Sequence, residues 1–411
     1  MSEILLFPVR PNDSFASRLA ESLKELEAYG DGDLSDKLIN RKFSDGEYNP
    51  VITEDNTDEP NKRRCEDKDV YLVWSITSQI TPTESFGRVL LLADAAYREG
   101  ADNVYLVLPY YYFNRQDIDP ALRYTKEFDS GNIEDIKLKK KLGKMEGQPF
   151  SLEVVVKHLH SAGIKKVLTM DDHSEHTREI YERIYGRDDA YVNLDPLPVY
   201  AHYILNSLSR DVDLGDKGSN VILFGPDKGS MDKIVKVYDL LDLECATKLL
   251  FDKNRLKEND PNEIESVLKE CDGDLSNLSN KVVLGFDDQG DSLGTFTNPF
   301  INLFRKEKPK YIFGCISHLI LPNSEAFTRV YKNRLNLIGT NSHPNIAYHA
   351  ELGVSQITVL DITKYFALAM IMCGKKGKDP SLALRYSKEN LDGVGFLYSP
   401  LKKANLISYS K

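Results

Sequence analysis

The segment GFDDQGDSLGT at residues 285–295 places three aspartates beside a turn of glycine and hydroxyl residues, directly after the apolar run KVVL. The backbone amides of Asp291–Thr295 could converge on a phosphate group, and a helix beginning near Phe296 would add the positive end of its dipole. Asp287 and Asp288 would repel a phosphate that they faced, so they suit a ligand that also carries hydroxyl groups or a magnesium ion. A sugar phosphate has that layout, and the segment therefore predicts a sugar-phosphate site.

Two cations, Lys253 and Arg255, lie one residue apart after the apolar run TKLLF. At a site for several phosphate groups they could neutralise the charge that grows during phosphoryl transfer. A Lys-x-Arg pattern alone is a weak signal, and a solvated loop would explain it equally well.

A cluster of acids and histidines, DDHSEH at residues 171–176, follows the apolar run KKVLTM. A histidine combined with oxygen ligands suits Mg²⁺ only when water and phosphate complete the coordination shell. Zinc would be an alternative, although no cysteine lies nearby in the sequence. His318 also follows an apolar run and could either reach the same cleft or be a hydrogen-bonded histidine at a strand end.

The early segment FSDGE at residues 43–47 combines an aromatic ring with two acids. The ring could stack on a purine while a carboxylate accepts a hydrogen bond from its amino group. The same residues would also suit a simple turn at a strand edge, and residue chemistry leaves both interpretations open.

Short apolar runs alternate with amphipathic helices along most of the chain, which predicts parallel sheets with right-handed crossovers. Strands are expected at residues 70–76, 103–112, 165–170, 219–226, 247–252, 281–286 and 311–317. Helices are expected from Pro82 to Gly100 and, with Ser151 as the cap, up to Gly163. In such a fold ligands bind beyond the carboxyl ends of the strands. The polar groups above, and Arg115–Asp117, all follow predicted strands, so we expect them to share one cleft.

Two α/β domains are expected to meet near residues 185–200, and two polar stretches interrupt the pattern at 54–69 and 118–148. Both are longer than a usual connection in a compact domain. The second stretch could be a tolerated surface insertion, or it could serve as a lid or an oligomer contact.

Bulk composition excludes several classes of function. The chain has 411 residues, a net charge of −10 and a sequence pI of about 5.4, which disfavours a nucleic-acid-binding protein. Its five scattered cysteines lack a CxxC pair, which favours a reducing compartment and argues against structural zinc. No apolar run approaches the roughly 18 residues of a membrane span. We therefore expect a cytoplasmic protein with no membrane or nucleic-acid partner.

Six motifs occur in the order FSDGE, NRQD, MDDH, GPDKG, DKNR and GFDDQGDSLGT, and this series resembles the ribose-phosphate pyrophosphokinase family. The likeness extends over nearly the whole chain. The last motif alone would not be specific, because purine and pyrimidine phosphoribosyltransferases share it. The resemblance implies two phosphoribosyltransferase-like domains, each a mainly parallel sheet flanked by helices. They would be an ATP- and metal-binding unit at 1–190 and a unit with the flap and sugar-phosphate loop at 191–350, followed by a strand, helix and tail at 351–411.

The resemblance also implies a role for each motif, with Mg²⁺ as the cofactor. ATP would be bound by Phe43, Asp45, Gly46 and Glu47 at the adenine and by Arg115 and Gln116 elsewhere, and catalysis would be carried out by Lys253 and Arg255. Asp287 and Asp288 would bind the ribose hydroxyls and the metal, and His173 would be a metal ligand. The 5-phosphate would be bound by Asp291, Ser292, Leu293, Gly294 and Thr295. A second metal ligand should lie at Asn193 or Asp195, and the sequence does not decide between them.

The implied reaction moves the diphosphoryl group of ATP to the 1-hydroxyl of ribose 5-phosphate, and the implied assembly is a dimer that builds a hexamer. The sequence departs from the family at Leu293, where glycine is usual, at Ser230 and Lys233 in place of glycine and arginine, and at Asp119, where a basic residue is common. These departures leave three alternatives open. They are a different acceptor such as ADP-ribose, a non-catalytic regulatory paralogue, and a phosphoribosyltransferase.

Overall fold

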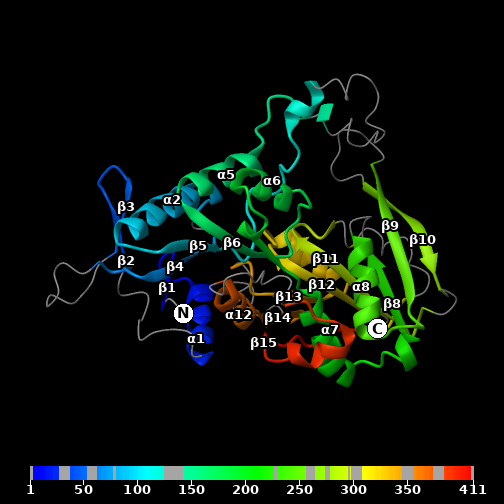
Figure 1. Ribbon diagram of the computed structural model, residues 1–411. Helices are drawn as coiled ribbons and strands as arrows, with labels where there is room; N and C mark the ends of the chain where they lie inside the picture. The colour runs from blue at the N-terminus through cyan, green and yellow to red at the C-terminus, as the bar shows by residue number, and fades with distance from the viewer. Residues whose placement is uncertain are drawn as a thin grey trace.

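The computed structural model describes most of the chain. The described residues are 3–26, 38–52, 63–76, 80–124, 142–143, 145–225, 230–255, 264–273, 278–294, 297, 308–344, 355–373 and 384–408, with backbone only at 123, 252–255, 264–267 and 269–270. Strands and helices alternate along it as the sequence predicts (Figure 1).

A five-stranded, wholly parallel sheet forms the N-terminal part of the molecule. In order across the sheet its strands are β1 (Glu3–Pro8), β4 (Lys68–Val73), β5 (Asn103–Val107), β6 (Ile164–Met170) and β7 (Tyr191–Leu194). Five of the six residues of β4 are buried, as expected of a strand covered on both faces. The helices of this part are α1 (Ser14–Glu25), α2 (Pro82–Arg98), α5 (Ser151–Ser161) and α6 (Thr177–Tyr185).

Local sequence explains where these helices begin. The Asp13 carboxylate accepts hydrogen bonds from the amides of Phe15 and Ala16 and so caps α1. Thr81 caps α2 in the same way, with Pro82 in the first turn, where its missing N–H costs nothing. The predicted cap of α5 is wrong, because the helix already includes Ser151 and its cap position, Phe150, makes no side-chain hydrogen bond.

The second sheet has eight strands and is mainly parallel. Its order is β10 (Ile264–Asp272), β9 (Thr247–Arg255), β8 (Val221–Gly225), β11 (Val282–Gly290), β12 (Tyr311–Leu319), β13 (Asn336–Thr340), β14 (Ile357–Asp361) and β15 (Ser399–Lys402). Only the two edge strands, β10 and β15, run antiparallel to their neighbours. Its helices are α7 (Leu197–Asn206), α8 (Met231–Leu241), α10 (Ser324–Lys332) and α12 (Thr363–Cys373). The predicted fold class, two α/β units with mainly parallel sheets, is confirmed.

The remaining elements are short. Strands β2 (Leu38–Lys42) and β3 (Tyr48–Ile52) form a separate hairpin, which Figure 1 shows at the opposite edge of the molecule from β9 and β10. Short 3₁₀ turns are η2 (Pro120–Tyr124), η3 (Asp188–Ala190), η4 (Leu208–Arg210), η5 (Asp216–Gly218) and η7 (Lys388–Val394). Of the stretch 118–148, residues 125–141 lie outside the described part of the chain.

The division of the chain at residues 190 and 350 remains a prediction, but the sheets show where the nearby strands belong. Strand β7 pairs with β6 in the first sheet, and β14 and β15 continue the second. Helix α12 then packs against α1, with the rings of Phe15 and Phe366 5.5 Å apart and the hydroxyls of Ser22 and Thr363 2.9 Å apart. The last part of the chain therefore contacts both sheet units.

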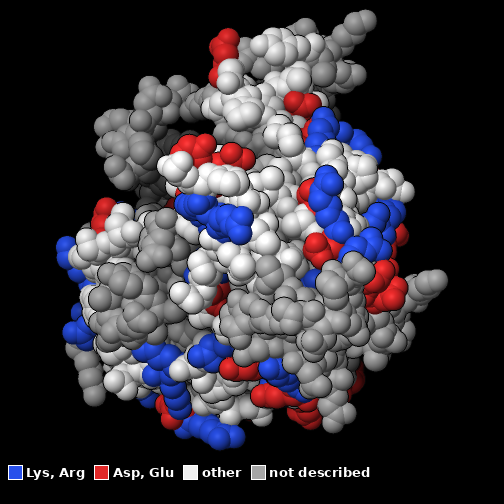
Figure 2. Space-filling model, turned by 90° about the vertical axis from the view of Figure 1, so that its left-hand side faces the viewer, with Lys and Arg blue, Asp and Glu red and all other residues white. Residues whose placement is uncertain are grey.

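One apolar core joins the two sheets. Buried residues of β1, β6 and β7 belong to the same hydrophobic cluster as those of β8, β11, α7 and α12. Because a continuous core transmits position between its parts, the sheets hold their facing edges in a fixed relation. No helix in the described part of the chain is long and apolar enough to cross a bilayer. On the face shown in Figure 2, acidic and basic residues are interspersed and the described atoms form no continuous basic band.

Candidate active site

The carboxyl ends of β5, β6 and β11 meet at the junction between the two sheets. Arg115, after β5, places Nη1 3.1 Å from Oδ2 of Asp291, after β11. His173, after β6, places Nδ1 2.5 Å from Oδ2 of Asp288. Three motifs far apart in the sequence are thus in direct contact, as their positions after parallel strands predict.

The His173–Asp288 pair is strongly coupled. The hydrogen bond with Asp288 raises the pKa of His173 above its ordinary value, and burial opposes this only in part. Burial alone would raise the pKa of Asp288, but the hydrogen bond with His173 and the charge of Lys233 hold the pKa below its ordinary value. The Asp288 side chain is only 14% exposed, so its charge lies in a poorly solvated space, whereas the His173 side chain is 47% exposed.

The donor set around this pair fits a magnesium ion in part. His173 uses Nδ1 toward Asp288, which leaves Nε2 for a metal, and Asp287 and Asp288 offer carboxylate oxygens. Within the described ranges no three histidine, cysteine or acidic side chains converge on one point, so water and phosphate oxygens would have to complete an octahedral shell.

The two candidates for a further metal ligand both have protein partners. Asp195 forms an ion pair with Lys236 and accepts a hydrogen bond from the amide of Leu197 at 2.9 Å. The Asn193 side-chain oxygen accepts from the amide of Asp172 at 3.2 Å. The choice between Asp195 and Asn193 therefore stays a prediction.

The turn after β11 shows how Leu293 fits where glycine was expected. Its φ of 59° lies in the left-handed region, and its side chain, 4% exposed, packs in the core of the second sheet. The amide and the hydroxyl of Thr297 both donate to the Leu293 carbonyl at 2.9 Å, as in the first turn of a helix. The Leu293 side chain therefore packs into the core.

Arg329 lies against the rest of the turn. A side chain at Gly294 would come within 2.6 Å of Nη1 of Arg329, so the arginine would have to shift to make room for it. Arg329 donates to the Ser292 carbonyl at 3.3 Å and braces the turn from α10. Thr295 lies outside the described residues.

Two residues that sequence reasoning did not single out support Arg115. The side-chain oxygen of Gln289 accepts from Nη2 of Arg115 at 3.2 Å and from the Tyr110 hydroxyl at 3.1 Å. The Tyr110 ring also lies 4.9 Å from the ring of His318. The only sequence signal was the position of Tyr110 directly beyond a buried strand. Gln116, by contrast, faces the start of α5, where it accepts a hydrogen bond from the Ser151 hydroxyl.

His318 is the hydrogen-bonded strand-end histidine of the two predicted alternatives. It is 2% exposed, with Nδ1 2.7 Å from the Ser342 hydroxyl and Nε2 3.0 Å from the Met170 carbonyl. Burial lowers the pKa of His318, which favours the neutral ring. It therefore connects β12 to the end of β6 rather than facing ligand.

The predicted adenine-binding residues Phe43, Asp45, Gly46 and Glu47 form the turn between β2 and β3. The amide of Phe43 donates to the Glu47 carbonyl at 2.9 Å, the amide of Gly46 to the Phe43 carbonyl at 2.9 Å, and the amide of Glu47 to the Asp45 carboxylate at 3.0 Å. The Phe43 side chain is 49% exposed. Among the described residues, these three hydrogen bonds of the turn all stay within it, and the structure does not bring the turn to the cleft.

The predicted catalytic pair lies on the arm formed by β9 and β10. Lys253 pairs with Ser266 and Arg255 with Ile264 in an antiparallel register. Their side chains, and residues 226–229 of the GPDKG motif, lie outside the described part of the structure.

Comparison with known proteins shows which proteins the chain resembles. Residues 4–124 match the family model for the N-terminal domain of ribose phosphate pyrophosphokinase. A ribose-phosphate pyrophosphokinase of Fusobacterium nucleatum is 24% identical over 331 residues, which cover 80% of this chain and 84% of that protein. A second, from Clostridium perfringens, is 28% identical over 291 residues, 70% of this chain and 72% of that protein.

The chain is thus similar to ribose-phosphate pyrophosphokinases, in its N-terminal part by the family model and over most of its length by these relatives. Its fold also matches the crystal structure of phosphoribosylpyrophosphate synthetase from Mycobacterium smegmatis, with a TM-score of 0.63 at 19% identity, over 89% of this chain and 96% of that one. At that identity the match supports the fold alone. The relatives are named ribose-phosphate pyrophosphokinases, and these names support that enzyme class.

Proposed function

We propose that the protein is a ribose-phosphate diphosphokinase that transfers the diphosphoryl group of ATP to the 1-hydroxyl of ribose 5-phosphate, giving phosphoribosyl pyrophosphate and AMP. One observation carries the proposal: the contacts of His173 with Asp288 and of Arg115 with Asp291 gather these side chains beside the turn after β11, where they would bind the metal, the ATP phosphates and the sugar phosphate. Two phosphorylated substrates could therefore meet there.

The chain's own residues would position both substrates. Amides of the turn from Asp291 to Gly294 would bind the 5-phosphate, while Asp287 and Asp288 accept hydrogen bonds from the ribose hydroxyls. Arg115 would exchange Asp291 for the ATP phosphates, since its side chain is 52% exposed and within reach of ligand. Lys253 and Arg255 would close over the transferring group and neutralise its charge.

In this reaction the 1-oxygen of ribose attacks the β-phosphorus of ATP in line with the bond to the departing AMP oxygen. The bond from the β-phosphorus to the sugar oxygen forms as the bond to AMP breaks. When bound near His173 and Asp288, Mg²⁺ would supply Lewis-acid neutralisation of the phosphate oxygens.

The proposal includes self-association. Phe43 is an exposed aromatic residue on a turn that lies away from this chain's cleft, so an adenine-binding role would place it in the cleft of another subunit. A dimer, or a hexamer built from dimers, would provide that neighbour. No membrane or nucleic acid has a part in the proposed reaction.

The decisive assay incubates purified protein with ATP, MgCl₂ and ribose 5-phosphate, and follows AMP and the sugar product. AMP and phosphoribosyl pyrophosphate in equal amounts are expected. AMP with ADP-ribose but not with ribose 5-phosphate would instead assign a different acceptor. No AMP with any acceptor would favour a regulatory paralogue. Sugar-phosphate transfer to a purine or pyrimidine base without AMP would assign a phosphoribosyltransferase.

Lys253→Ala tests the catalytic arm. We expect turnover to fall about 10³-fold while nucleotide affinity changes little, because the lysine would act on charge in the transition state. Lys248→Ala is the matched control on the same strand, since Lys248 pairs with Asp272 at 2.8 Å. Near-normal turnover in the Lys253 variant would refute its catalytic role.

A further inference from the structure

Lys233 joins the two sheets directly beneath the cleft. It lies in the first turn of α8, and its Nζ is 2.8 Å from Oδ1 and 2.9 Å from Oδ2 of Asp171, the first residue after β6. The Lys233 side chain is 22% exposed and that of Asp171 10%. The pair is therefore a largely buried ion pair between elements of different sheets, which is costly to break from one side.

Other groups hold Asp171 in the same place. The Ser317 hydroxyl, on β12, donates to Oδ2 of Asp171 at 2.5 Å, and the Asp171 amide donates to the Leu194 carbonyl at 3.0 Å. The φ of Asp171 is 45°, in the left-handed region that non-glycine residues rarely adopt. A strained backbone persists only where its surroundings fix it, and here Lys233 and Ser317 do so from the second sheet.

Asp171 stands two residues before His173, so its position sets where the histidine emerges. His173 must cross the junction to reach Asp288 on β11, with a separation of 2.5 Å between Nδ1 and Oδ2. A shift of the turn at Asp171 would be passed to His173 with little loss, because the chain between them is only one residue long.

Lys233 also offsets charge in the cleft. Burial alone would lower the pKa of its ammonium group, but three nearby carboxylates raise it instead; they belong to Asp171, Asp288 and Asp287, in order of decreasing effect. One fixed cation thus faces three acids that would otherwise repel one another in a poorly solvated space.

We propose that Lys233 is a positioning residue: by binding Asp171 across the junction and offsetting the charge of Asp287 and Asp288, it assembles the His173–Asp288 pair before any substrate arrives. Its consequence for turnover rests on the proposed function, whereas its structural role does not. Lys233 touches no reacting atom in this scheme, and it acts through Asp171 and His173.

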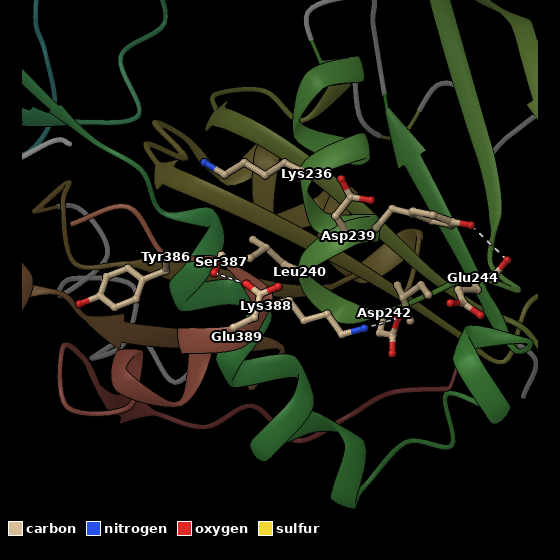
Figure 3. A pocket seen from close by; sticks show the side chains of 11 residues that line it. Lys236, Asp239, Leu240, Asp242, Glu244, Tyr386, Ser387, Lys388 and Glu389 are labelled. Carbon is tan, nitrogen blue, oxygen red and sulfur yellow. Dashed lines mark hydrogen bonds and ion pairs between the residues drawn. The ribbon is translucent and has the colours of Figure 1, made fainter. Parts of the chain in front are cut away.

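The test compares Lys233→Met, which keeps length but removes charge, with Lys233→Arg. The matched control is Lys388→Met. Lys388 forms an exposed ion pair with Asp242 at the other end of α8, 2.6 Å long, beside a hollow of about 610 Å³ (Figure 3). Each lysine thus forms an ion pair at one end of α8, but of the two only Lys233 does so in the cleft.

Two readouts are expected to move together in Lys233→Met. Amide hydrogen exchange across residues 170–174, measured without substrates, should rise by about tenfold or more as the turn is released. Turnover should fall about 100-fold with the KM for ATP changed less than about threefold, because a displacement near 1 Å affects chemistry more than binding. Lys233→Arg should restore most of both, and Lys388→Met should change neither.

Each other result overturns the proposal. Faster exchange with normal turnover would make Lys233 merely structural, and unchanged exchange with low turnover would make it a substrate contact. If Lys233→Met does not fold, Asp171→Asn, which keeps the shape of the side chain, takes its place with the same expectations at smaller size. If the wild-type protein forms no AMP, the proposed function fails, but the exchange measurement still decides whether Lys233 holds the turn.

Discussion

Two regions predicted to contact ATP differ in how the structure holds them. Arg115 lies in the junction between the sheets, where Asp291 and Gln289 fix its guanidinium group from the other sheet. Phe43 lies in the turn of the β2–β3 hairpin and is 49% exposed, and the strands of the hairpin contact α2 through the Lys42–Glu84 ion pair and through Arg88 over the Tyr48 ring. The contacts that hold Arg115 thus come from within one chain. The hydrogen bonds of the turn at Phe43 fix the shape of the turn but do not bring it to the cleft. The function of the junction can be tested by one substitution within a chain. The function of the turn can be tested by removing the Phe43 ring or a neighbouring subunit.

The largest effect is expected from Asp288→Asn in the junction. Loss of the carboxylate removes the partner of His173 together with the proposed metal and ribose contacts, so turnover should fall about 10³-fold or more. Steady-state AMP formation measures this. Asp94→Asn, at an exposed ion pair on α2, is the control and should keep full activity. A drop of less than about tenfold would show that the junction is not the reaction centre.

An intermediate effect is expected from Phe43→Ala on the hairpin. The KM for ATP should rise about tenfold through lost stacking, with the melting temperature unchanged because the ring is already exposed. If the turn binds ATP in its own chain, the Phe43→Ala variant should show the same KM for ATP in a monomeric and an oligomeric preparation. Mixing it with Asp288→Asn would regain part of the activity if the turn serves a neighbouring subunit, and the absence of any recovery would count against that arrangement.

The smallest effect is on stability against pH in the metal-free protein. The pKa of His173 is raised, so the stabilisation from its pair with Asp288 is fully present below about pH 6.5, the ordinary value, and is lost as pH rises through the raised pKa. Because His173 is 47% exposed, the loss should be only about 0.5 kcal/mol of unfolding free energy. Urea unfolding across this range measures it, and the slope should vanish in Asp288→Asn.

The sequence predicted the strands and the convergence of their ends because both follow from simple periodic patterns. The apolar runs before His173 and Asp288 are buried strands, and parallel strands must present their carboxyl ends on one edge. The identity of the motifs then supplied the chemistry. That much needs no knowledge of contacts between distant residues.

What the sequence could not show were the cross-sheet partners. Nothing near Lys233 in the chain indicates Asp171, 62 positions away, or that Gln289 would receive both Tyr110 and Arg115. The sequence also did not show where the Leu293 side chain points, because its direction depends on the left-handed backbone conformation of that residue. Such features depend on how two sheets dock, which no local pattern encodes.

The contact of α12 with α1 sets an order for folding during synthesis. Phe15 and Ser22 find their partners, Phe366 and Thr363, only when some 350 further residues have been made. Until then the first helix has its contacts with β1 but lacks those with α12, although its own sheet is already complete. A nascent chain would therefore expose apolar surface near its N-terminus for most of translation. Chaperone binding to ribosome-bound chains should fall sharply once α12 has left the exit tunnel.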